Sequence, residues 1–170
     1  MKTLTTDEAV KWCVNHKIAV DAKGDHEIAF KGYNVLRFEI PQAVNRVYWL
    51  SNVIQEKLQP WDQCLLWVTA WGIWESSENW HLYYRLRRSY ADDKLIEEAP
   101  GHLFLGNEKQ DFVSFLQLGL QYGWDVCLFP ENSNNRAFAS HDGWVELAMV
   151  DQVDLEKTKR ELRESEIILL

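Results

Sequence analysis

Apolar residues recur at helical spacing in five stretches of the chain, and this periodicity predicts five helices. The first helix follows Thr5 and Glu8, which form a capping-box pattern. Gly123 is a residue type typical of the C-terminal end of a helix, and it follows the fourth predicted helix. Asp151 or Asp154 is predicted to begin the last helix. The predicted helices cover residues 5–16, 42–58, 76–90, 107–123 and 151–165.

Alternating or continuous apolar runs predict strands between the helices. The segments 27–30 and 35–40 flank a Lys-Gly-Tyr-Asn turn, so they are predicted to form a hairpin. The run 64–71 is apolar at nearly every position, which predicts a central strand covered on both sides, with Trp67 and Trp71 pointing to the same face. Short connections join the remaining strands into a meander. These other strands are 102–105, 124–129, 136–139 and 144–150.

The order of these elements predicts the fold class. Helices and strands do not alternate as βαβ units require, and 170 residues suit one domain. We therefore expect a single α+β domain over 1–170, with a mixed, mostly antiparallel sheet, helices packed over it, a C-terminal three-stranded meander and a terminal helix. Most of the nine tryptophans should cover the sheet, and the apolar tail Ile167–Leu170 should dock on the protein.

Composition and charge narrow the classes of function. The 18 basic and 26 acidic residues give a net charge of −8, which opposes binding to phosphate backbones, so no nucleic-acid partner is expected. Cys13, Cys64 and Cys127 each lie in an apolar run, which predicts buried thiols in a reducing compartment. No apolar stretch reaches membrane-spanning length, so we expect a soluble cytoplasmic protein without a membrane partner.

The predicted helix over 76–90 carries the main candidate for a binding surface, and Ser76 or Ser77 is its candidate N-cap. Its core-facing stripe is predicted to be Leu82, Tyr83, Leu86 and Tyr90. The opposite face is predicted to hold Trp80, Tyr84, Arg87 and Arg88. Because Trp, Tyr and Arg are enriched in interaction hot spots, these four residues are predicted to bind an acidic or planar partner. The alternative is that both faces are buried and the arginines pair with carboxylates between Asp92 and Glu98.

No motif predicts a catalytic centre. Ser140, His141 and Asp142 are the residue types of a hydrolytic triad, but adjacent side chains cannot form the relay, so this run is predicted to be a turn. The histidines and cysteines lack metal-ligand spacing and the glycines lack a nucleotide-binding pattern, so no metal or cofactor is expected. The alternative site is a pocket between sheet and helices, with His102, Arg136 and His141 as its polar groups.

These features favour a non-enzymatic protein-interaction or adaptor domain. A narrower form of this hypothesis is an immunity-type protein that neutralises a partner toxin, since small size and acidity permit that role. The alternative is a small-molecule-binding protein or a hydrolase that uses the pocket just described. Neither the partner nor the oligomeric state follows from the sequence.

Overall fold

Seven strands form one sheet in the computed structural model, which describes the backbone of residues 1–71 and 77–170 and the side chains of 1–71 and 81–170. The strand order is β1-β4-β3-β5-β6-β7-β2, and every described pairing is antiparallel. The strands are β1 (Lys2–Leu4), β2 (Asn34–Glu39), β3 (Gln63–Ala70), β4 (Gly101–Leu105), β5 (Asp125–Pro130), β6 (Arg136–Ser140) and β7 (Trp144–Met149). The predicted α+β domain is confirmed, including the β5-β6-β7 meander.

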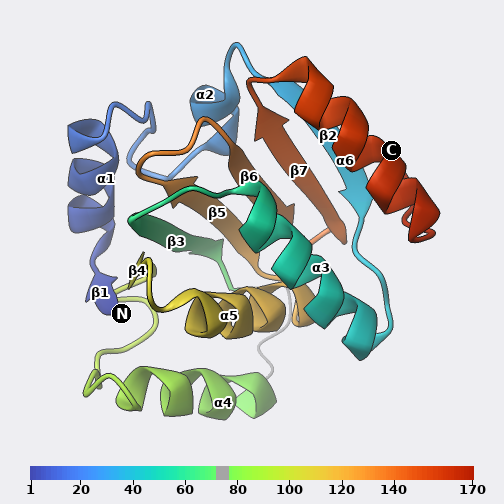
Figure 1. Cartoon of the computed structure of the whole chain (residues 1–170). Helices are drawn as coiled ribbons and strands as arrows, with labels where there is room; N and C mark the ends of the chain where they lie inside the picture. The colour runs from blue at the N-terminus through green and yellow to red at the C-terminus, as the bar shows by residue number, and fades with distance from the viewer. Residues whose placement is uncertain (72–76) are drawn as a thin grey trace.

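Helices cover both faces of this sheet. The helices are α1 (Thr6–Asn15), α2 (His26–Phe30), α3 (Val44–Lys57), α4 (Ser77–Arg88), α5 (Lys109–Gln121) and α6 (Gln152–Glu164). In Figure 1, α3, α5 and α6 cross one face, whereas α1 and α2 lie against the other. Among the helices of the described residues, none is long and apolar enough to cross a membrane.

The sheet separates two hydrophobic cores. Leu66 and Val68 of β3 point into the larger core, where they meet side chains of α3 and α5. Leu65 and Trp67 alternate with them and point into the smaller core, beneath α1 and α2. Burying one such large apolar side chain contributes about 1.5–3 kcal/mol. The prediction that this strand is covered on both sides is confirmed.

An irregularity in β3 overturns the predicted orientation of Trp71. The register against β5 shifts between Val68 and Ala70, so that one extra residue is inserted into β3. Such a bulge reverses the alternation of side chains that follow it. Trp67 therefore lies in the smaller core, while the Trp71 ring packs against the larger one, 4.9 Å from the Trp124 ring.

The predicted hairpin over 27–30 and 35–40 is wrong in its first half. Residues 27–30 belong to α2, where the Asp25 carboxylate accepts a hydrogen bond from the Glu27 amide (2.9 Å) and caps the helix. Phe30 and Ala29 are buried in the smaller core. The second half is a strand as predicted, but β2 pairs with β7 instead. The short β1 was not predicted, because three residues are too few to show a period.

The apolar tail docks on the protein, as predicted, and the structure places it at the free edge of β2. The Glu39 amide donates to the Ile168 carbonyl (2.9 Å), and the Leu170 amide donates to the Arg37 carbonyl (3.0 Å). Ile167 is only 6% exposed and belongs to the larger core, whereas Ile168 is 58% exposed.

Ile167→Ala should therefore destabilise the protein by about 2–4 kcal/mol, because it removes buried methyl and methylene groups and leaves a cavity. Ile168→Ala is the matched control and should change the free energy of unfolding by less than about 0.5 kcal/mol. Urea denaturation followed by circular dichroism measures both. Equal effects of the two substitutions would show that the tail is not docked.

Candidate functional site

Helix α4 is rotated relative to the predicted orientation. Tyr83 is buried as predicted, but Arg87 is also completely buried, so the prediction that Arg87 points outward is wrong. Leu82, predicted to face the core, is 37% exposed, and Arg88 is exposed. The side chain of Trp80, and Ser76 as a whole, lie outside the described residues, so the predicted roles of both stay predictions.

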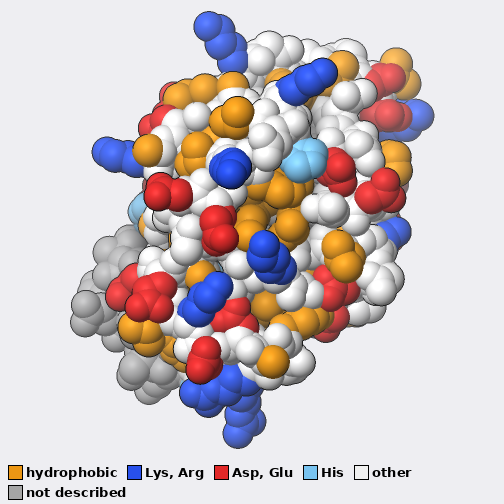
Figure 2. All heavy atoms as spheres, turned by 90° about the vertical axis from the view of Figure 1, so that its left-hand side faces the viewer, with side chains coloured by type: hydrophobic (Ala, Val, Ile, Leu, Met, Phe, Trp, Pro, Cys, Tyr) orange, Lys and Arg blue, Asp and Glu red, His pale blue; other side chains and the backbone are white. Residues whose placement is uncertain are grey.

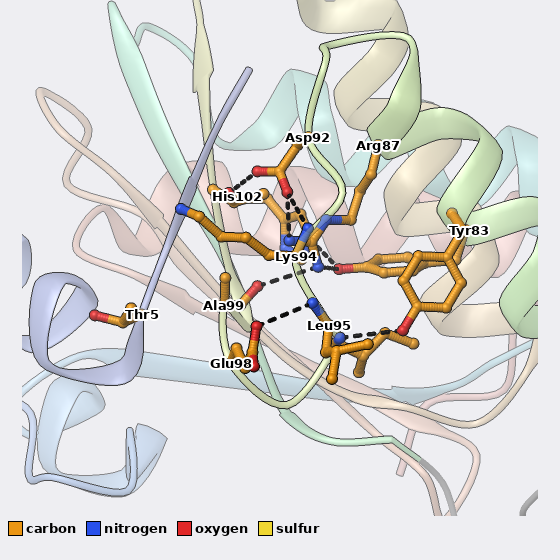
Figure 3. Close-up of polar contacts among 12 residues, drawn as sticks. Thr5, Tyr83, Arg87, Asp92, Lys94, Leu95, Glu98, Ala99 and His102 are labelled. Atoms are coloured by element: carbon orange, nitrogen blue, oxygen red, sulfur yellow. Dashed lines mark hydrogen bonds and ion pairs between the residues drawn. The ribbon is translucent and has the colours of Figure 1, made fainter.

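A directed chain of hydrogen bonds starts at Arg87 (Figure 3). Its Nη1 donates to the Tyr83 hydroxyl at 2.8 Å, and that hydroxyl donates in turn to Nε2 of His102 at 2.5 Å. The other ring nitrogen of His102 then donates to the Leu66 carbonyl at 3.3 Å. These partners require a neutral imidazole with its proton on Nδ1.

Asp92 supplies the counter-charge for Arg87. Its carboxylate accepts from Nη2 of Arg87 (3.0 Å), from the Lys94 amide (3.0 Å) and from the Thr3 hydroxyl. Burial raises the pKa of Asp92, but these hydrogen bonds and the guanidinium more than offset burial and hold the pKa below its usual range. The network therefore joins β1, α4, the 89–100 segment, β3 and β4. The alternative prediction, in which an arginine pairs with a carboxylate of 92–98, is confirmed for Arg87.

The titratable members of this network are poor acids and bases near neutral pH. Burial, aided by the charge of Arg87, lowers the pKa of His102 to about 3. Burial also raises the pKa of Tyr83 well above its ordinary value. Proton transfer at pH 7 would thus require either a charged imidazole or a phenolate in a buried site. The arrangement is suited to holding α4 in place rather than to acid–base chemistry.

The structure does not bring together the polar residues of the predicted alternative pocket. His102 lies on the larger-core face of β4, whereas Arg136 shares the opposite face with Phe138. Arg136 stacks over the Tyr33 ring (4.8 Å) and donates to the Ala29 carbonyl.

His141 lies in the turn between β6 and β7, as predicted. Its Nδ1 is 2.8 Å from the Asp125 carboxylate, so its ring is oriented by a residue other than Ser140. The Ser140 hydroxyl accepts from the Asp142 amide (3.2 Å), which is a local turn contact. Gly143 has φ +85°, a conformation that glycine adopts without strain. These contacts confirm the predicted turn and give no triad geometry.

The three cysteines are buried thiols, as predicted. Burial raises the pKa of Cys13 to about 12 and those of Cys64 and Cys127 well above the usual value, so these thiols are unreactive near neutral pH. Within the described part of the chain, no cluster of three or more histidine, cysteine, aspartate or glutamate side chains could hold a metal ion.

An open groove lies between α4 and α5. The two helices run side by side in opposite directions, and the Tyr90 hydroxyl near the end of α4 donates to Asp111 near the start of α5 (2.5 Å). The groove has a volume of about 480 Å³. Its described lining consists of Leu82, Arg85, Leu86, Ser114, Gln117, Leu118, Gln121 and Tyr122.

The groove has one cation in its wall, Arg85, which the sequence interpretation did not include. Arg85 shares an exposed stripe of α4 with His81 and Arg88, since the three residues are spaced i, i+4 and i+7. Of the three arginines in the last turn of α4, Arg87 alone has an ion pair with a described side chain. The spacing of Arg85 and Arg88 could have predicted this stripe, but only with the correct rotation of the helix.

A second cavity, of about 580 Å³, lies between α2 and the sheet. It contains none of the three residues predicted for a pocket. Its most buried charged group, Glu146, is already bonded to Arg37 (2.5 Å) and lies 3.5 Å from His26. Figure 2 views the α1 side of the molecule and shows acidic, basic and apolar side chains interspersed over the described residues of this side.

No protein-family model, curated protein or solved structure matches the chain. The class that can be stated is the one the fold defines, an α+β protein built on a seven-stranded antiparallel sheet. The second cavity also has exposed apolar residues, Ile28 and Val35, but it is lined by three carboxylates, those of Asp25, Glu27 and Glu146. The α4–α5 groove combines the exposed Leu82 with Arg85, and its described lining holds no carboxylate.

Arg87→Met should cost about 3–5 kcal/mol of stability, because it leaves Asp92 and Tyr83 without their buried partner. Arg88→Met makes the same chemical change on the exposed face and should cost less than about 0.5 kcal/mol. Urea denaturation of the two variants tests the difference. Similar stabilities would contradict the burial of Arg87.

His102 should remain neutral well below its ordinary pKa. A folded-state pKa of about 3, below the unfolded value near 6.5, means that the unfolded chain takes up the proton first. The contribution of His102 to stability is thus complete above pH 6.5 and is lost as the pH falls from 6.5 toward 3. The His102 ring signals in NMR should stay constant from pH 7.5 to 5, while N-acetylhistidine in the same tube titrates. A midpoint above pH 5 for the His102 ring would contradict the network.

Proposed function

We propose that this chain is a non-enzymatic protein-interaction domain whose partner binds the surface formed by α4 and α5. The observation that carries the proposal is the groove itself. Leu82, Leu86 and Leu118 offer apolar surface to solvent there, beside Arg85. Apolar side chains next to arginine and tyrosine are the composition found at the centres of protein interfaces.

The other features of α4 support this surface indirectly. Arg87 acts as a positioning residue, because its buried contacts decide which side of α4 faces solvent. The Tyr84 hydroxyl accepts a hydrogen bond from the Ile96 amide (3.2 Å), so Tyr84 holds the segment that follows the helix. Arg88 remains a proposed contact residue, on the exposed stripe. The titratable groups of the buried network, Tyr83, Arg87, Asp92 and His102, are bonded to one another, which favours binding over catalysis.

A narrower form of the proposal concerns the biological role of the complex. A small acidic domain that covers the functional surface of a toxin would be an immunity-type protein. Restoration of growth when the chain is co-expressed with its partner would support that role.

The proposal is tested by purifying the tagged chain from the cells that express it. Leu82→Glu should reduce the recovery of the partner at least about tenfold, because it places a charge in the apolar groove. Quantitative mass spectrometry of the co-purified proteins measures the change.

Val153→Glu is the matched control, since Val153 is also an exposed apolar residue (64%) but lies on α6. The partner should be recovered in equal amounts with Val153→Glu and with the unchanged chain. If all three forms of the protein retain the same set of proteins, then α4 and α5 do not form the binding surface.

A further inference from the structure

We infer that the segment that binds the α4–α5 groove is an acidic amphipathic helix. Its apolar side would lie on Leu82, Leu86 and Leu118, and its carboxylates would pair with Arg85 and Arg88. This inference rests on the proposed function and names the chemistry of the partner.

The shape of the groove favours a helix over an extended strand. Both walls are helices, whose backbone amides and carbonyls are already bonded within α4 and α5. An extended segment would find no backbone partners there and would leave its own amides unpaired against leucine side chains, whereas a helix satisfies its own backbone.

The length of the groove sets the spacing of the contacts. On α5 the lining runs from Ser114 to Gln121, which corresponds to about 10 Å, or two helical turns. A helix lying along this length would present apolar side chains at i, i+3 or i+4, and i+7, which is the common mode of helix recognition in a groove.

The charges around the groove determine which side chains are expected on the polar side of the bound helix. No carboxylate belongs to the described lining, although the whole chain carries a net charge of −8. Arg85 lines the α4 side, and Arg88 is exposed three residues further along α4, outside the described lining, while the α5 side is lined by the uncharged Ser114, Gln117 and Gln121. Arg85 and Arg88 are separated by about 4.5 Å along the helix axis, so carboxylates three or four residues apart on the partner would meet both.

The experiment selects peptides from a random display library of 16-residue helices on the immobilised full chain. Recovered peptides should be enriched in Asp and Glu on one side and in Leu or Phe at i, i+3 or i+4, and i+7. Fluorescence anisotropy should then show that Arg85→Glu combined with Arg88→Glu weakens their binding at least about tenfold, because two attractive pairs become repulsive.

Two further variants serve as controls. Arg160→Glu makes the same charge change at an exposed site on α6 and should leave binding unchanged, apart from a small general effect of net charge. Leu82→Glu combined with Gln121→Glu alters exposed residues of the groove and should abolish binding. Circular dichroism confirms that each variant is folded.

The possible outcomes separate the inference from the proposed function. Peptides that need Leu82 and Gln121 but carry basic or neutral flanks, or bind the double arginine variant equally well, would overturn the inference and leave the proposed function standing. Peptides that bind independently of the groove variants would overturn both. Sedimentation velocity tests whether a second copy of the chain occupies the groove instead. A dimer that dissociates in the Leu82→Glu and Gln121→Glu variant would show that it does, and would also overturn the inference.

Discussion

The orientation of α4 depends on one buried charge, the guanidinium of Arg87. A charge that is completely removed from water is tolerated only when it is paired and hydrogen-bonded. Tyr83 of α4, together with Asp92 and the Ala99 carbonyl of the segment after the helix, provides these partners. A rotation of α4 about its axis would break these bonds together, so the network selects a single orientation of the helix.

That orientation has a consequence for the surface. When Tyr83 and Arg87 face the core, Arg85 and Arg88 necessarily face outward, because they lie on the other side of the helical wheel. Leu82 is displaced to the boundary between buried and exposed sides, where it forms the wall of the groove with α5. A polar network in the interior thus determines which apolar residues of α4 face solvent.

Much of the fold could be predicted because its signals are local. The two-sided apolar run of β3, the short turns of the meander and the capping residues Thr5 and Asp151 each act within a few residues. The predictions that were wrong concern residues for which a tertiary contact outweighed the local sequence pattern. Hydrophobic periodicity counts an arginine as polar, so it placed Arg87 outside, and only the alternative prediction, based on the carboxylates between Asp92 and Glu98, named its partner. Likewise, the register shift that redirects Trp71 is a property of the pairing between β3 and β5.

The docked tail also affects how the sheet can interact with other chains. An unpaired edge strand is a template on which another strand can add. At the β2 edge, the amide of Glu39 and the carbonyl of Arg37 are already bonded to residues 168 and 170, and at the opposite edge β1 is only three residues long. The sheet therefore offers little backbone for strand addition at either edge. The proposed partner would therefore have to match the shape and charge of side chains on the helices rather than extend the sheet.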